Sequence, residues 1–214
     1  MSSVTYTAGM PIQGVASFPV AGTCTATPQG PPPAPGAPPA PVITPAQLAQ
    51  AAYGLLQLPM PKPSHYPNGI LKENGHPYTL VNANTWFWTD PSTWTPVSRT
   101  VSAGAVSATA TATPVTLGFT PGDGGHTVTC QGPGTEFKAT TATWVSPENP
   151  QGCSYRYPNS SYGVGGDDQV TATYTITWKV TWSGSDGTGG TFNNLQTQTT
   201  SRFSVAELLT VVTR

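Results

Sequence analysis

The stretch Val170–Trp182, VTATYTITWKVTW, alternates apolar and polar side chains over thirteen positions. Its even-numbered positions hold valine, alanine, tyrosine, isoleucine or tryptophan, and its odd-numbered positions hold threonine or lysine. Successive side chains of an extended strand point to opposite faces of a sheet. The pattern therefore predicts a strand with one buried and one solvated face, which is typical of antiparallel sheets.

Shorter segments on both sides of this stretch also predict strands. Apolar runs and alternating threonine-rich runs recur from Tyr78 onward, with turn-forming residues such as Ser183–Gly190 between them. Pro114 interrupts the alternation and predicts a bend or a bulge. Several short strands separated by turns are the signature of a β-sandwich. We expect these strands at 80–81, 86–88, 101–113, 115–119 and 203–211.

Residues 44–58 carry the signals of one amphipathic helix. Thr44 is a suitable N-cap, Pro45 occupies the first helical position, and Gln47 completes a capping box. Leu48, Ala52 and Leu55 follow at helical spacing and form an apolar stripe. A helix of this length is marginal alone, so it must pack on the sandwich or on another chain.

The segment before this helix is rich in proline. Residues 28–41, PQGPPPAPGAPPAP, predict a stiff polyproline II linker, because each proline fixes its own φ and lacks an N–H donor. Cys24 precedes this linker. Three interpretations of it are open: a free thiol, a cysteine paired with another chain, or the remnant of a lipid-attachment site. The chain thus divides into an N-terminal tail (1–43), a helix (44–58), an irregular connector (59–78) and a β-sandwich (79–214).

The composition is unusually poor in charge. Charged residues make up 8% of the 214 residues, against roughly 25% in an ordinary soluble protein. Such an uncharged polar composition is common in secreted and cell-wall proteins. The net charge of −1, without a basic run, argues against nucleic acid as a partner. No stretch approaches the roughly 18 apolar residues of a membrane-spanning helix, and the N-terminus lacks the pattern of an export signal.

Two of the three cysteines lie in the strand-rich region. Cys130 and Cys153 flank one excursion rich in glycine and proline, so a disulfide is the natural interpretation, and two buried thiols are the alternative. A disulfide closing this loop would stabilise the fold by about 3 kcal/mol on the chain-entropy model. It would also indicate an oxidising compartment. We therefore expect a secreted or surface-exposed protein whose export signal is absent from this sequence.

Residues 112–124, ATPVTLGFTPGDG, resemble the start of a polycystic-kidney-disease-type (PKD) domain, in which an alternating strand and an aromatic residue precede Gly-Asp-Gly. Cys153–Pro158, followed by the Val170–Trp182 strand, resembles the second signature of that family. In the turn, Gly122 and Gly124 supply positive φ and the Asp123 side chain accepts from backbone N–H groups. The resemblance implies an Ig-like antiparallel β-sandwich.

Residues 80–211 also resemble a group of actinobacterial exported or cell-envelope proteins. Phe119 stands where that group more often has tryptophan, a difference that should alter packing alone. The resemblance implies an extracellular module and no particular activity. The shared elements are Trp86–Trp88, the Gly-Asp-Gly turn, Cys130–Thr135, a second cysteine before Tyr-x-Tyr, Trp178–Trp182 and Val205–Glu207.

The sequence offers no constellation for catalysis, metal binding or a cofactor. His65, His76 and His126 lie in segments rich in proline and glycine, and we interpret them as polar loop residues. Asp167–Asp168 could chelate calcium, but solvated turn carboxylates are the preferred interpretation. The scattered acidic residues form no acid–base pair, and neither a G-x-S-x-G elbow nor a P-loop is present. We therefore expect a protein that is not an enzyme.

Three tryptophans, Trp86, Trp88 and Trp94, could instead form a platform for stacking sugars. Trp86 and Trp88 share one face of their predicted strand, and packing in the core is the default interpretation of both. We expect a spacing, adhesion or assembly module whose partner is a protein or a cell-wall glycan. The alternatives are a carbohydrate-binding module that uses these tryptophans, and a subunit of an extracellular filament or envelope complex, joined through the helix or a strand edge.

Overall fold

The structure is a computed structural model that describes residues 42–72, 75–140 and 146–207. Residues 1–41 of the predicted tail, with Cys24 and the proline-rich linker, lie outside the described residues, as do residues 208–214, which include the end of the predicted closing strand. Within the described residues the protein is mainly β, with one α-helix, one 3-10 helix and ten strands. In chain order these are α1 (Pro45–Gly54), β1 (Pro63–Tyr66), β2 (Gly69–Ile70), β3 (Pro77–Leu80), β4 (Asn84–Thr89), η1 (Pro91–Thr93), β5 (Val97–Ala103), β6 (Val106–Thr120), β7 (Val128–Gln131), β8 (Ser154–Arg156), β9 (Val170–Gly184) and β10 (Gly189–Ala206).

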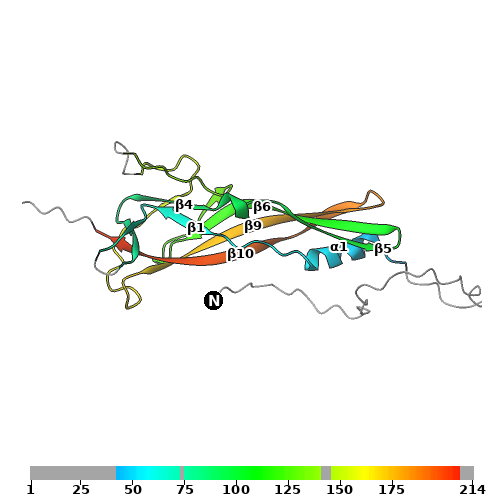
Figure 1. The fold of residues 1–214 in the computed structure, drawn as a ribbon, viewed down its shortest axis with the longest axis horizontal. Helices are drawn as coiled ribbons and strands as arrows, with labels where there is room; N and C mark the ends of the chain where they lie inside the picture. The colour runs from blue at the N-terminus through cyan, green and yellow to red at the C-terminus, as the bar shows by residue number, and fades with distance from the viewer. Residues whose placement is uncertain (1–41, 73–74, 141–145, 208–214) are drawn as a thin grey trace, which may run out of the picture.

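The strands form two sheets. The seven-stranded sheet has the order β2-β3-β10-β9-β6-β5, with β7 added beside β6, and the three-stranded sheet has the order β1-β4-β8. All strand pairs are antiparallel except β3 and β10, which run parallel. The long strands β6, β9 and β10 extend along the molecule, and the three-stranded sheet lies near one end of them (Figure 1).

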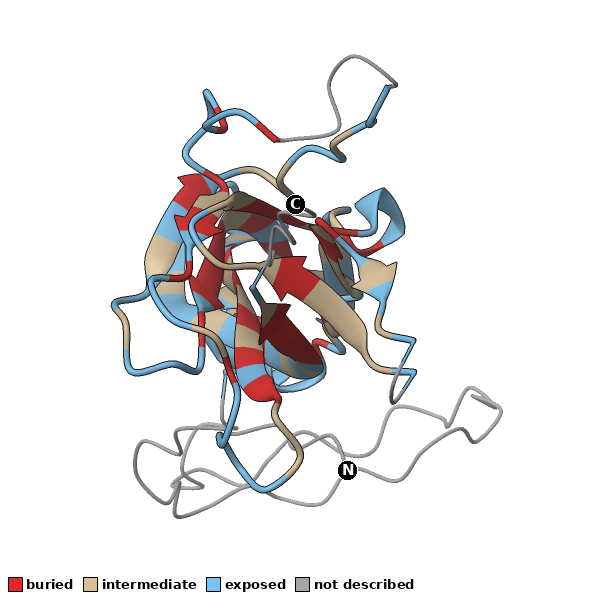
Figure 2. Ribbon diagram, turned by 90° about the vertical axis from the view of Figure 1, so that its left-hand side faces the viewer, coloured by how far each residue is buried: buried red, intermediate tan, exposed pale blue. Residues whose placement is uncertain are grey.

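The alternating stretch Val170–Trp182 belongs to β9, at the centre of the large sheet. β9 pairs with β10 from Val170 opposite Phe203 to Ser183 opposite Gly189, and with β6 on its other side. Its apolar side chains from Val170 to Val180 are buried, whereas the alternating threonines are exposed or half-buried, as the sequence predicts. Buried positions alternate in the same way along neighbouring strands (Figure 2).

The two sheets share one core of aromatic and aliphatic side chains. Phe87 of β4 stacks on Phe119 of β6, with ring centroids 4.6 Å apart. Tyr174 of β9 meets Phe119 edge-on at 5.2 Å, and Tyr157 meets Phe203 of β10 edge-on at 6.0 Å. These edge-to-face contacts add to the energy of burying the rings.

Helix α1 covers the half of the large sheet that the small sheet leaves open (Figure 1). The predicted capping box is present, because Thr44 accepts from the Gln47 N–H and Gln47 accepts from the Thr44 N–H. The predicted stripe is wrong at its end. The helix ends at Gly54, so Leu55 leaves helical spacing and is 58% exposed, while Leu56 enters the core.

Two further expectations differ from the structure, and the bulge expected at Pro114 is confirmed. The connector 59–78 is not irregular, because it contains β1, β2 and the start of β3, which pair with distant strands. The alternating run 101–113 is divided by a turn at Gly104 into β5 and β6. Strand β6 continues through Pro114, and Pro114 is still paired with Trp178 of β9. The register with β9 then shifts between Pro114 and Thr116, which is the bulge that the sequence allows.

Candidate functional site

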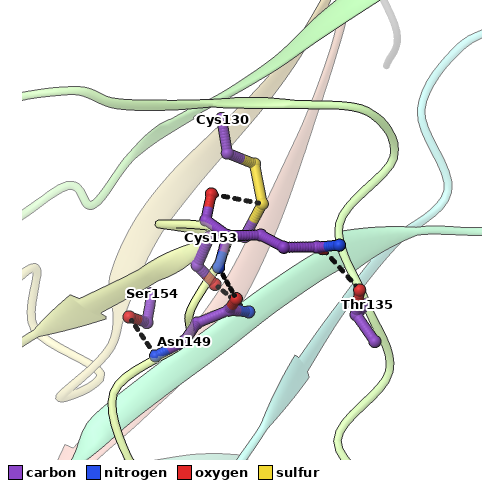
Figure 3. The surroundings of a disulfide bond; sticks show 6 residues. Cys130, Thr135, Asn149, Cys153 and Ser154 are labelled. Atoms are coloured by element: carbon purple, nitrogen blue, oxygen red, sulfur yellow. Dashed lines mark hydrogen bonds between the residues drawn. A yellow bond between two sulfur atoms is a disulfide. The ribbon is translucent and has the colours of Figure 1, made fainter.

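A disulfide between Cys130 and Cys153 joins the two sheets (Figure 3). Cys130 lies in β7 of the large sheet, and Cys153 directly precedes β8 of the small sheet. The Cα atoms are 5.4 Å apart, and both residues are buried. The pairing predicted from the sequence is therefore present. It connects two layers that, among the described residues, share no backbone hydrogen-bond ladder.

Polar contacts hold the chain around Cys153 in place. The Asn149 side-chain amide donates to the Cys153 carbonyl at 3.3 Å, and the Asn149 backbone N–H donates to the Ser154 hydroxyl at 3.3 Å (Figure 3). Thr135 reaches across the loop and donates to the Gln151 side chain at 2.6 Å. The Phe87 N–H donates to the Cys153 carbonyl at 3.1 Å and thereby fixes the sulfur bridge against β4.

The Gly-Asp-Gly turn follows β6 and contacts β8, the strand that Cys153 precedes. Gly122 has φ +82°, and a Cβ there would come within 2.3 Å of the Thr171 carbonyl oxygen, so glycine is required. One Asp123 carboxylate oxygen accepts from the Gly125 N–H at 2.8 Å, and the other accepts from the Tyr155 hydroxyl at 2.9 Å. Burial, and then this contact with Asp123, raises the pKa of Tyr155 to about 12. Asp123 thus ties the turn to β8.

The three tryptophans do not share one environment. Phe87, not its neighbours, fills the core from β4, so Trp86 and Trp88 lie on the opposite face of that strand. Trp86 is 8% exposed, contacts Phe137 edge-on and donates its indole N–H to the Pro147 carbonyl at 2.6 Å. Trp88 is half-buried, and Trp94 follows η1 and is half-buried against the main core. The sugar-stacking role of these residues stays a prediction.

The histidines divide between the core and the loops. The interpretation of His65 as a loop residue is wrong: it belongs to β1, is 7% exposed and stacks on Phe203 with ring centroids 4.2 Å apart. Burial lowers the pKa of His65 to about 4. The error arises because β1 pairs with β4, more than twenty residues later, which local composition does not reveal. His76 and His126 lie outside strands and helices.

The two adjacent aspartates point to separate partners. Asp167 forms an ion pair with Arg202 of β10. Asp168, at φ +58°, accepts from the Gly163 N–H at 2.6 Å and so closes its own turn. In the part of the chain that the structure describes, no cluster of three or more histidine, cysteine or acidic side chains is placed to hold a metal ion.

A hollow on the outer face of the large sheet was not anticipated from the sequence. It has a volume of about 230 Å³ and is lined by six threonines, Gln196, Gln198 and Gly118. These residues come from β6, β9, β10 and the segment that enters and forms β7. The available signal was Gly118 itself, a single glycine inside an otherwise alternating strand, which is typical of a bulge or of a close approach to the backbone.

No family model, curated protein or solved structure matches this chain. Among the described residues, no helix reaches the length and apolar character that crossing a membrane requires.

Proposed function

We propose that this protein is a non-catalytic spacing, adhesion or assembly module that works outside the cell or at its surface. We further propose that its two sheets form an Ig-like, PKD-type β-sandwich. Support for this family comes from β6, which ends in the Gly-Asp-Gly turn with positive φ at both glycines and with Asp123 accepting from the Gly125 N–H. The long Val170–Gly184 strand and the aromatic segment before it agree with the same family pattern.

The observation that carries the spacing role is where the described chain enters and leaves the large sheet. Pro45, at the start of α1, lies against the turn between β9 and β10, because a Cβ placed on Gly184 would come within 2.6 Å of the Pro45 Cβ. From that turn β10 runs for 18 residues, about 60 Å at the rise of a strand, before the described chain ends. Entry and exit therefore lie at opposite ends of the long axis (Figure 1).

The disulfide supports an oxidising location. A bond between Cys130 and Cys153 persists where thiols are not kept reduced, which is the condition outside the cell or in its envelope. The surface agrees with this setting, because the outward positions of β6, β9 and β10 carry mainly threonine, serine and glutamine. A proline-rich segment that precedes the entry point would hold such a module away from its attachment site.

Fractionation of the cells that make the protein tests this proposal. Culture fluid, envelope and cytoplasm are each alkylated without reduction, digested and analysed by mass spectrometry. We expect the protein in the culture fluid or envelope, with the Cys130 and Cys153 peptides linked, and we expect protease to cleave it on intact cells. Protein confined to the cytoplasm with both thiols alkylated would contradict the proposed location.

A further inference from the structure

The outer face of the large sheet presents a grid of side chains centred on Gly118. The strand register places Gly118 of β6 between Thr129 of β7 and Thr175 of β9, and Thr175 lies opposite Gln198 of β10. Residues opposite one another in a sheet share a face, so these four positions form one row across four strands. The hollow of about 230 Å³ lies over this row.

The structure does not require glycine at position 118. Its φ is not in the left-handed region, and a Cβ there would meet nothing closer than the Thr175 Cβ at 3.6 Å. The other glycines that the structure places in strands differ, since a Cβ would come within 2.9 Å of a neighbouring atom at each of them. Glycine in a strand interior lowers stability, and β-branched residues suit such a position better. The missing side chain thus keeps the hollow open.

The lining of the hollow is uncharged and rich in hydrogen-bonding groups. No acidic or basic side chain contributes to it. Thr120 is paired with Thr127 at 2.8 Å, and Gln196 donates to Thr177 at 3.4 Å. Within the described part of the chain, the side chains of Thr129, Thr175 and Gln198 have no hydrogen-bond partner. Each hydroxyl both donates and accepts, and each amide offers two donors and a carbonyl acceptor.

We propose that this hollow, here called the Gly118 hollow, binds one sugar unit of a neutral polysaccharide chain. A neutral, hydroxyl-rich ligand matches the absence of charge in the lining, and its hydroxyls would pair with Thr129, Thr175 and Gln198 while the threonine methyl groups contact its C–H faces. The volume lies below the roughly 300–1,000 Å³ of pockets that enclose drug-sized ligands, which suits a single unit of a longer chain. The inference deepens the adhesion role proposed above and rests on it.

The affinity of a single hollow should be low. The site is open to solvent, and its polar groups exchange hydrogen bonds with water for hydrogen bonds with sugar, so the net gain per contact is small. We expect a dissociation constant on the order of 1 mM for a short oligosaccharide. Useful adhesion would then arise from several copies acting on one polysaccharide chain.

Titration of the full-length, isotope-labelled protein followed by NMR tests the proposal. The probes are neutral oligosaccharides of glucose, mannose, galactose and N-acetylglucosamine, with an oligogalacturonate as the charged comparison. We expect saturable shifts of the amides of 116–120, 127–129, 175–177 and 196–198 with at least one neutral probe, and weaker or no shifts with the charged one. No shift at these amides with any neutral probe at tens of millimolar, or a preference for the charged probe, would overturn the proposal.

Three variants locate the binding site. Gly118→Thr fills the hollow with the residue type that surrounds it, and we expect it to weaken binding at least tenfold while the Tm stays equal or rises. Thr175→Val removes one hydroxyl from the lining at nearly constant shape, and we expect about a threefold loss. Thr181→Val makes the same change on the same face of β9 outside the hollow, and we expect no loss. Equal binding by folded Gly118→Thr, or equal losses in both valine variants, would contradict this site.

The two proposals fail separately. Absence of glycan binding removes the Gly118 hollow as an adhesion site and leaves the location of the protein and the spacing geometry untouched. Protein found reduced in the cytoplasm contradicts the proposed function whatever the titration gives.

Discussion

The two halves of the large sheet are covered in different ways. One half, which we call the body, is covered by the three-stranded sheet, to which the disulfide links it. There β6 and β9 contribute large side chains such as Leu117, Phe119 and Tyr174. The other half, which we call the arm, is covered by α1, and the β6 residue in the cluster beneath the helix is small: Ala108, which is 1% exposed. A helix that packs closely needs small residues beneath it, whereas two sheets about 10 Å apart need large ones between them.

The bulge in β6 lies at the boundary between these halves. Before it, the even-numbered positions up to Ala112 face inward, and after it the odd-numbered Leu117 and Phe119 do. One extra residue at Pro114–Thr116 therefore moves the inward positions from one parity to the other. Because of the bulge, one continuous strand can pack against α1 in the arm and against the three-stranded sheet in the body.

The largest expected effect comes from emptying the centre of the body. Phe119→Ala removes a fully buried ring that stacks on Phe87 and meets Tyr174 edge-on. We expect the free energy of unfolding to fall by about 3–5 kcal/mol, because a cavity forms where both sheets meet. Denaturant unfolding measures this loss. A loss below about 1 kcal/mol would show that the body does not depend on this contact between the sheets.

Removing the link between the sheets should come next. In Cys130→Ala/Cys153→Ala the unfolded chain regains the freedom of a loop whose ends are 23 positions apart. We expect a loss of about 3 kcal/mol on the chain-entropy model. The wild type under reducing conditions is the comparison. If thermal unfolding of both were unchanged, the disulfide would add nothing to the packing of the body.

Acid should weaken the body through His65. Its pKa is about 4 when folded, against about 6.5 for an unfolded imidazole, so folding disfavours the charged form. Above pH 6.5 the imidazole is neutral in both states and folding carries no such cost. As the pH falls from 6.5 to 4, the unfolded imidazole binds a proton that the folded one does not, and the stability falls by about 3 kcal/mol by pH 4. We expect His65→Phe, which preserves stacking on Phe203, to lose clearly less stability than the wild type between pH 7 and pH 4. Equal losses would place the acid sensitivity in the carboxylates.

The smallest expected effect belongs to the arm. Leu48→Ala shortens an α1 side chain that is 8% exposed and belongs to the same cluster as Ala108. We expect a loss of about 2 kcal/mol, at the low end for such substitutions because the site lies near the surface. Circular dichroism checks that α1 persists. Leu55→Ala, at a position 58% exposed after the helix, is the matched control and should change stability little.

Sequence periodicity identified the strands whose alternation of apolar and polar residues is visible without knowledge of the strands they pair with. The alternation of Val170–Trp182 revealed both faces of β9, and the capping residues around Thr44 revealed the start of α1. The disulfide followed from two cysteines that flank one excursion. These features are local, or nearly so, and each has a direct physical cause in backbone geometry or chain closure.

The remaining features depend on distant partners. β1 and His65 look like loop sequence, and the pairing of β1 with β4 is what buries them. The choice of Phe87 for the core depends on which face of β4 meets β6, and a run of three aromatics gives no alternation to decide it. The Gly118 hollow requires four strands in register, and a lone glycine in the sequence does not reveal that arrangement.

The central claim is that the large sheet is stabilised separately by the three-stranded sheet in the body and by α1 in the arm, and a rigid spacer needs both. Native-state hydrogen exchange along β9 tests this claim most directly. We expect amides of 170–177 to exchange through global unfolding, and those of 179–184 through a lower-energy opening of the arm. Leu48→Ala should accelerate exchange of 179–184 and leave 170–177 nearly unchanged, whereas Phe119→Ala should accelerate both. Equal acceleration of both segments by Leu48→Ala, or no protection of 179–184 in the wild type, would contradict this account.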